Sequence, residues 1–260
     1  MTVNVSTIAT GLNLFTFQGV VATAGRVVVT TLDSRLVRVS TDGKTETLAD
    51  LSHYGIPFGL TQCAGDLVVA ISAEESGDVL VRVAPDGRVL GVTDLSDICG
   101  SFGAPFGVAI AKDGYAVTIA TDVSASTGCL INVNHAGAIT ILADLSAYGI
   151  PFDVAALNGG FVVAQEKGNL VKVATDGTVT SLVNLVDAGY GIPFGVAVSQ
   201  CQLIVTTNTG QLLQVTPSGA VTAIANLTAD GFGIPSGIAV CDQRYLVTTT
   251  AGSLLAVSLA

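Results

Sequence analysis

The sequence lacks several features that define common functional classes. Its 260 residues include no tryptophan, one methionine and two histidines, and only 12% of them are charged. No apolar run approaches the roughly 18 residues that a membrane helix needs. The first residues, Met1 to Val5, have neither the basic stretch nor the apolar core of a secretory signal. We therefore expect no membrane partner and no export.

Basic residues are also scarce. Ten lysines and arginines are scattered among 20 acidic residues, and the net charge is −10. Because the basic residues form no cluster, nucleic acid and anionic membrane surfaces are not expected as partners. A small cationic or neutral molecule suits this charge better.

Common catalytic and metal-binding motifs are missing as well. The five cysteines show no CxxC spacing, and an odd number of them without a secretory signal indicates free thiols in the cytoplasm. The chain has no GxSxG nucleophile motif, no phosphate-binding P-loop and no HExxH zinc motif.

What the sequence does have is an internal repeat. Five times an aromatic residue and a glycine precede a proline-containing turn into an apolar strand, starting at Tyr54, Phe102, Tyr148, Tyr190 and Phe232. A degenerate sixth copy spans residues 15–19. The turn glycine, or its replacement, recurs at positions 19, 59, 107, 153, 195 and 237, at intervals of 40, 48, 46, 42 and 42 residues. Such a period is typical of propellers and other repeat folds.

Each repeat contains the pattern of four short strands. In the fifth repeat they cover residues 195–198, 203–206, 212–215 and 221–224; the first two are almost continuously apolar and the last alternates. Six such units predict an all-β, six-bladed β-propeller with four antiparallel strands per blade. The 19 residues up to the first marker and the 23 after the last together make one more repeat of 42. We therefore expect a single domain over residues 1–260, whose last blade is closed by an N-terminal strand around residues 3–8.

The strand start at residues 193–198, Pro-Phe-Gly-Val-Ala-Val, resembles NHL-repeat propellers. More loosely it is similar to the SMP-30/gluconolactonase, strictosidine-synthase-like and virginiamycin-B-lyase-like propellers. The resemblance implies the fold, but these families carry different activities. SMP-30-like enzymes hold a metal with Glu, Asn and Asp, including a Glu-Gly pair near the start, where this chain has Gln18-Gly19. Strictosidine-synthase-like enzymes rely on one glutamate, to which Glu166 corresponds by position.

Aromatic residues are concentrated in the repeated turns, which contain 11 of the 14 phenylalanines and tyrosines. Because these turns are expected to surround one mouth of the central channel, they predict either an apolar ligand pocket or wedges between blades. Gln18 and Ser236 replace the turn phenylalanine in two copies and are expected to open room there. The candidate ligand-binding residues are Phe17, Gln18, Tyr54, Phe58, Phe106, Phe152, Phe194 and Ser236.

Candidate catalytic residues are those that break the repeat. Asp153 replaces the turn glycine, and Glu166 follows Ala164-Gln165, where three other copies have paired threonines. His53 precedes the aromatic residue of the first full copy. Two carboxylates and an imidazole at one mouth could perform acid/base chemistry. Oxygen ligands near Asn208 could instead hold Ca²⁺ or Mg²⁺; Asp122, Glu74 and Glu75 add further carboxylates.

Two functional hypotheses follow. The first is a propeller that binds a small apolar or cationic molecule at the aromatic mouth and acts on it as a lyase, isomerase or hydrolase. The alternative is a non-catalytic scaffold that binds a protein partner. An open aromatic funnel with Asp153 and Glu166 converging would favour the enzyme, whereas phenylalanines packed against one another would favour the scaffold.

Overall fold

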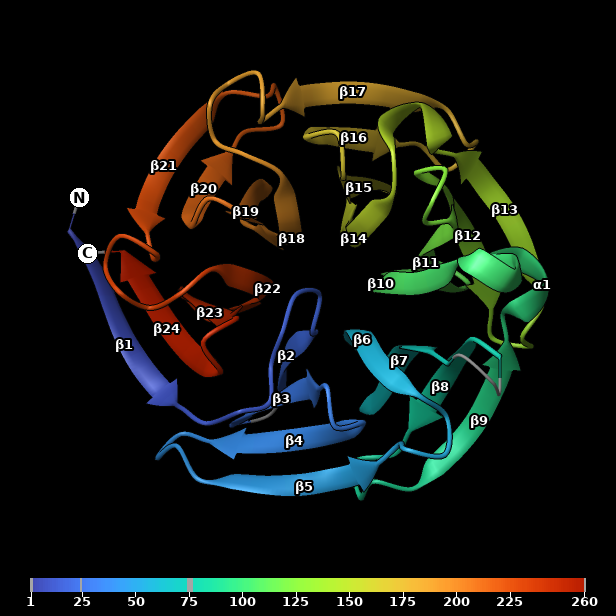
Figure 1. The fold of residues 1–260 in the computed structure, drawn as a ribbon, viewed down its shortest axis with the longest axis horizontal. Helices are drawn as coiled ribbons and strands as arrows, with labels where there is room; N and C mark the ends of the chain where they lie inside the picture. The colour runs from blue at the N-terminus through green and yellow to red at the C-terminus, as the bar shows by residue number, and fades with distance from the viewer. Residues whose placement is uncertain (1, 24, 74–76, 260) are drawn as a thin grey trace.

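The computed structural model describes residues 2–23, 25–73 and 77–259. They form six separate four-stranded antiparallel sheets, arranged as blades around a central axis (Figure 1). This confirms the expected six-bladed β-propeller.

The strands follow one another within each blade from the axis outward. Blade one consists of β2 (Val20–Thr23), β3 (Arg26–Thr31), β4 (Arg35–Ser40) and β5 (Thr45–Asp50); blade two of β6 (Ile56–Cys63), β7 (Asp66–Ser72), β8 (Val79–Val83) and β9 (Val89–Asp94); blade three of β10 (Ala104–Ala111), β11 (Gly114–Asp122), β12 (Thr127–Asn134) and β13 (Ile139–Asp144). Blade four consists of β14 (Pro151–Leu157), β15 (Gly160–Gln165), β16 (Asn169–Val173) and β17 (Val179–Asn184); blade five of β18 (Pro193–Ser199), β19 (Gln202–Thr207), β20 (Gln211–Val215) and β21 (Val221–Asn226); blade six of β22 (Pro235–Cys241), β23 (Arg244–Thr249), β24 (Ser253–Leu259) and β1 (Val3–Ala9).

The ends of the chain close the ring. β1 pairs antiparallel with β24, with Val3 opposite Leu259 and Thr7 opposite Leu255, so it is the outer strand of blade six (Figure 1). The predicted closure by the N-terminal strand is therefore confirmed. It covers the edge that β24 would otherwise expose.

Strand direction defines two faces. Each inner strand begins at the repeated turn, so these turns, the connections between blades and the turns between second and third strands share one face, here called the aromatic face. The hairpins that join first to second and third to fourth strands form the opposite face. Asp-Gly and Ser-Gly turns stand in the outer hairpins as predicted, and their glycines at 43, 87, 177 and 219 all have positive φ.

The core is divided into six apolar clusters, one between each pair of neighbouring blades. Second strands such as β7, with five fully buried residues in a row, supply side chains to the clusters on both of their faces. Tyr54, Tyr148, Tyr190 and Phe232, the first aromatics of four repeats, pack against these clusters. These four rings are therefore wedges between blades.

Helical structure is minor. The described residues contain α1 (Ser96–Cys99), η1 (Gly100–Phe102) and η2 (Ser146–Tyr148), all in connections between blades. None of these helices has the length and apolar character needed to cross a membrane.

Candidate functional site: the axial channel

The inner strands approach one another so closely at the turn that five of the six blades need glycine there. A Cβ on Gly59 would overlap the carbonyl oxygen of Phe106, and one on Gly237 would overlap that of Gln18. Each clash involves backbone of the next blade, which cannot move aside. The glycine of the repeat is therefore explained by packing around the axis.

At this level, a buried threonine links each of several blades to the next one. We call this arrangement the threonine clasp. The hydroxyl of Thr118, in the middle of β11, accepts a hydrogen bond from the Gly107 N–H at 2.6 Å and donates to the Phe152 carbonyl of the next blade at 3.3 Å. Thr30 makes the same pair of contacts, with Gly19 at 2.7 Å and Phe58 at 2.8 Å. The clasp therefore joins one blade to the next through a single side chain.

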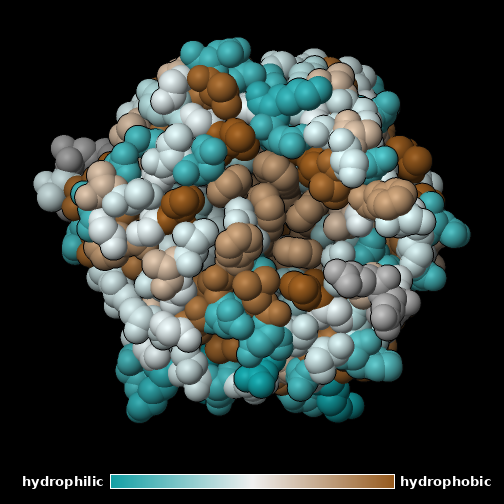
Figure 2. All heavy atoms as spheres, viewed as in Figure 1, coloured by the Kyte–Doolittle hydropathy of each residue, from teal (hydrophilic) through white to brown (hydrophobic). Residues whose placement is uncertain are grey.

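Phenylalanines cover the axis at the aromatic face. The ring of Phe17 lies 4.5 Å from that of Phe152, and within 5.2 and 5.3 Å of Phe106 and Phe194. Phe17 precedes blade one while Phe152 belongs to blade four, on the other side of the ring, so Phe17 reaches across the axis. Phe58 joins the cluster through Phe106 at 5.3 Å. The centre of this face is accordingly apolar, and hydrophilic and further hydrophobic residues are mixed around it (Figure 2).

Gln18 and Ser236 do not open the mouth, contrary to expectation. The side chain of Ser236, 1% exposed, accepts the Phe17 N–H at 2.8 Å, which helps to hold Phe17 in its left-handed conformation with φ of 72°. Gln18 is fully buried and its Oε1 accepts the Phe15 N–H at 2.7 Å. Phe17 thus fills the space that the two missing turn phenylalanines leave.

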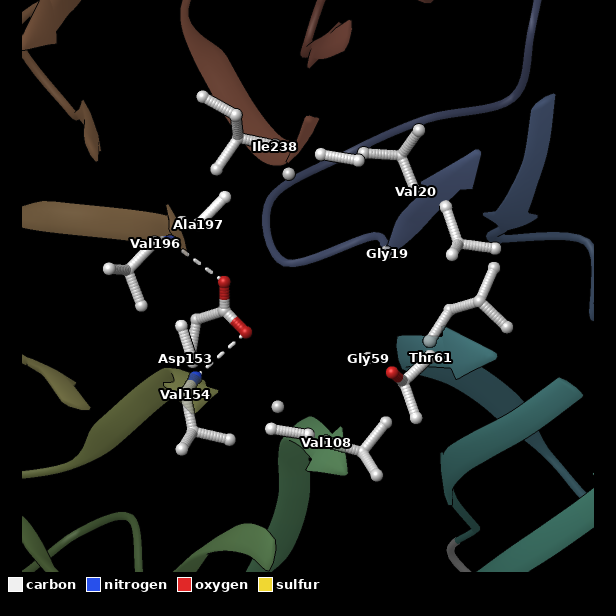
Figure 3. Close-up of a pocket in the computed structure, with 18 of the residues that line it drawn as sticks. Gly19, Val20, Gly59, Thr61, Val108, Asp153, Val154, Val196, Ala197 and Ile238 are labelled. Atoms are coloured by element: carbon white, nitrogen blue, oxygen red, sulfur yellow. Dashed lines mark hydrogen bonds between the residues drawn. The ribbon is translucent and has the colours of Figure 1, made fainter. Parts of the chain in front are cut away.

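Beneath the phenylalanines the channel widens into a cavity of about 350 Å³. Its walls are mainly Val, Ala, Leu and Ile side chains and the backbone of the inner strands, including Val20, Val108, Val196 and Ile238 (Figure 3). Ala156 and Ile110, near the far ends of β14 and β10, are exposed. The channel is therefore accessible from the opposite face.

Asp153 is the only carboxylate among the described residues that line this cavity. Its two oxygens point into the channel and accept the N–H groups of Val154 at 2.9 Å and of Val196, in the next blade, at 2.8 Å (Figure 3). Protein surrounds the carboxylate, and burial raises the pKa of Asp153 to about 6 although both hydrogen bonds lower it. The side chain is still partly accessible through the channel.

A second residue of blade four also departs from the repeat. Ala164 pairs with Asp153 at the position that Thr118 and Thr206 occupy in their blades, so the clasp hydroxyl is missing. The Asp153 carboxylate supplies the link to blade five instead. Blade two has Ala70 at the threonine position and keeps Gly59, so loss of the threonine alone does not call for an aspartate. The Gly-to-Asp replacement is therefore the informative signal, and comparison of the repeats identifies it.

Glu166 does not join Asp153 in the channel. It accepts the Ile150 N–H at 3.2 Å through its side chain, and its own N–H donates to the Ile150 carbonyl at 2.9 Å. Asn208 makes the equivalent pair of contacts with Ile192 in blade five, at 2.8 and 3.0 Å. Both residues therefore hold the start of the turn in their own blade, and neither lines the channel.

His53 also lies away from the cavity. It is exposed at the rim of the aromatic face, and its ring meets the edge of Tyr54 with centroids 5.2 Å apart. Asp122 caps its own loop by accepting the Ala125 N–H at 2.9 Å. Glu74 and Glu75 lie outside the described residues.

The donor set does not fit a Ca²⁺ or Mg²⁺ site. Across residues 2–23, 25–73 and 77–259, no three His, Cys, Asp or Glu side chains gather closely enough to hold a metal ion. Calcium takes six to eight oxygen ligands, whereas Asp153 is the single carboxylate in a wall of mainly apolar side chains. The channel instead suits a molecule with one polar group and an apolar body.

Comparison with known proteins supports the fold alone. No protein-family model matches the chain, and no curated protein matches its sequence. Among solved structures, an inactive virginiamycin B lyase from Staphylococcus aureus with quinupristin is 14% identical, with a TM-score of 0.68 over 94% of this chain and 80% of that one. A streptogramin B lyase is 11% identical, with a TM-score of 0.71 over 99% and 98%. A putative oxidoreductase (glucose dehydrogenase) from Thermus thermophilus is 14% identical, with a TM-score of 0.72 over 98% and 100%.

Proposed function

We propose that this protein binds a small apolar molecule carrying a protonated amine, with the amine on Asp153 and the apolar body in the axial channel. The observation that carries the proposal is a lone carboxylate inside a cavity of about 350 Å³ with apolar walls. A buried charge needs a partner, and an organic ammonium supplies both the charge and the apolar surface.

The free lone pairs of the carboxylate support this assignment. Each oxygen of Asp153 accepts one backbone N–H, and a carboxylate has about four acceptor positions in all. The remaining positions are available to an ammonium group that enters from the opposite face. The net charge of −10 also favours attraction of cations over anions.

Binding is better supported than catalysis. A carboxylate with a pKa of about 6 could act as a general base near neutral pH. The expected partners Glu166 and His53 hold a turn and lie at the rim, so lyase, isomerase or hydrolase chemistry would have to proceed with Asp153 alone. We therefore propose ligand binding as the main function. A reaction of the bound amine with Asp153 as the only base is a more specific part of the same hypothesis.

The resemblance to NHL-repeat and SMP-30-like propellers is compatible with either a binding or an enzymatic role. We also retain a cytoplasmic location as part of the proposal, since all five cysteines are free. Neither nucleic acid nor a membrane is among the proposed partners.

The test compares wild type with the variant Asp153→Gly/Ala164→Thr, which restores the pattern of blades three and five. The introduced glycine and threonine should form the clasp seen at Gly107 and Thr118, so the fold should be retained. The probes are small apolar amines, such as cyclohexylamine and phenethylamine, their neutral alcohol analogues, and Ca²⁺ and Mg²⁺ alone. Binding is measured by calorimetry and thermal shift.

We expect an amine at 100 times its Kd to stabilise wild type by about 2.7 kcal/mol. The alcohols and the metal ions should not bind to wild type, and the double variant should no longer bind the amine. The amine affinity should fall by up to tenfold per pH unit below about pH 6, because the carboxylate must be ionised. Equal binding to the double variant, or no binding of any amine, would contradict the proposal.

A further inference from the structure

Among the first aromatic residues of the five full copies of the repeat, one faces solvent instead of the core. Tyr54, Tyr148, Tyr190 and Phe232 pack against clusters between blades, whereas Phe102, at the same position between blades two and three, is 70% exposed. Helix α1 lies just before it, and the buried Cys99 of that helix packs in the cluster instead. The insertion of α1 therefore turns the ring of Phe102 outward.

Phe102 is not alone at this part of the aromatic face. Ile56 and Val123, in the neighbouring turns of blades two and three, are 38% and 48% exposed. Exposed apolar side chains scattered singly are normal, but a group of them on a rigid frame is characteristic of an interaction surface. We call Ile56, Phe102 and Val123 the Phe102 patch.

Charge is distributed very unevenly between the two faces. Among the described residues, and apart from Asp153 in the channel, strand direction places ten acidic and two basic side chains at the aromatic face, but seven acidic and eight basic ones toward the opposite face. Seven of those ten carboxylates belong to blades one to three: Asp78, which is buried, and six that are at least partly exposed, Asp33, Asp50, Asp94, Asp97, Asp122 and Asp144. In that sector the one basic residue described is Arg35, which pairs with Asp33 at 3.3 Å.

Three of these carboxylates are not required by the local fold. Asp50, Asp94 and Asp144 end the outer strands of their blades and accept the N–H groups of Ser52, Ser96 and Ser146, each at 2.9 Å. At the same position blades four and five have Asn184 and Asn226, whose amide oxygens also cap the following turn, at 3.0 and 2.9 Å. The turn needs a hydrogen-bond acceptor, and the neutral amide oxygen of asparagine provides one. The negative charge of the aspartates in blades one to three is therefore not needed to form the turn.

These charges are present at neutral pH. Hydrogen bonds from Ser52, Ser96 and Ser146 lower the pKa of the Asp50, Asp94 and Asp144 carboxyls. All three residues are exposed, so their field extends into solvent.

From these observations we infer that the aromatic face over blades one to three docks a basic, apolar segment of a partner protein, with Phe102 as the central anchor. Interfaces are enriched in aromatic residues at their centre and have a polar rim, and the residues that carry most of the binding energy lie near the centre. The carboxylates would speed the encounter and select against acidic partners, while the Phe102 patch would provide the apolar contact. This surface is separate from the axial channel, so the two proposals can fail independently.

The probe is a synthetic peptide in which lysines alternate with leucine and phenylalanine, and its control replaces every lysine with glutamate. Binding to the full-length protein is measured by fluorescence anisotropy at low and high salt. Phe102→Ala is the test variant, and its 70% exposed ring predicts an unchanged melting temperature. Phe15→Ala is the matched control, because Phe15 is 59% exposed on the same face but lies in the connection between blades six and one rather than between blades two and three.

We expect the basic peptide to bind wild type and Phe15→Ala alike, and Phe102→Ala to weaken it by about tenfold or more. The triple variant Asp50→Asn/Asp94→Asn/Asp144→Asn keeps the turn acceptors and should reduce the salt dependence of binding. Equal binding of the acidic peptide, equal losses from the two phenylalanine variants, or no binding of the basic peptide would overturn the inference.

Discussion

At the scale of single residues, Asp153 is the position where a carboxylate replaces the glycine of the repeat. The other blades have glycine there, and sequence comparison of the repeats was sufficient to identify Asp153 as exceptional. Its actual partners, Val154 and Val196, could not be predicted, because they depend on how blade five is placed against blade four. The same comparison was misleading for Glu166, since Asn208 makes equivalent contacts without a negative charge.

Asp153 should make stability depend on pH. Burial raises its pKa to about 6 from an ordinary value of 3.8, so the folded state prefers the protonated carboxyl. The stabilisation is complete below about pH 4 and is lost as the pH rises through 6; a shift of this size corresponds to on the order of 2 to 3 kcal/mol.

Chemical denaturation between pH 4 and 7.5 measures this effect. The Asp153→Gly/Ala164→Thr variant serves as the reference, because it removes the carboxyl and keeps the other titrating groups. The difference in unfolding free energy between the two proteins should change across this range. If the difference stays constant with pH, the proposed protonation of Asp153 is wrong.

At the scale of strands and turns, the threonine clasp links a local turn to a neighbouring blade. Its position in the second strand is visible as repeated threonines in the sequence, but their hydrogen bonds to the next blade are not. The hydroxyl of Thr118 is fully buried and serves two backbone groups from different blades.

Thr118→Val should therefore destabilise the protein by about 1–3 kcal/mol, because the Gly107 N–H loses its acceptor in a buried place. Thr118→Ser keeps the hydroxyl and should cost less. Urea denaturation compares the two variants, and a smaller loss for Thr118→Val than for Thr118→Ser would show that the methyl group, rather than the clasp, is what matters.

At the scale of the whole molecule, the ring is held together by the pairing of β1 with β24. The repeat spacing predicted this closure, since the leading and trailing pieces add up to one repeat. Each blade buries its apolar residues only against its neighbours, so the ring is most vulnerable at the blade assembled from both ends of the chain.

Removing residues 1–10 should uncover the edge of β24 and lower the melting temperature by roughly 10 °C, with increased self-association. Differential scanning calorimetry and light scattering measure the two effects. Adding a peptide of residues 2–10 in trans should partly restore stability. A truncated protein that melts like the full chain would mean that β1 is dispensable.

The sequence by itself determined the number of blades, their four strands, the closing strand and the odd position of Asp153. These follow from hydropathy, turn residues and spacing, which act between residues close in the chain. Only the tertiary structure decided that Phe17 crosses the axis, that Phe102 faces outward, and that Asp153 stands in the channel without Glu166 or His53. The positions of Phe17 and Asp153 depend on contacts between blades that lie far apart in the chain. That of Phe102 depends on the local insertion of α1, which redirects a side chain that the repeat alone would bury.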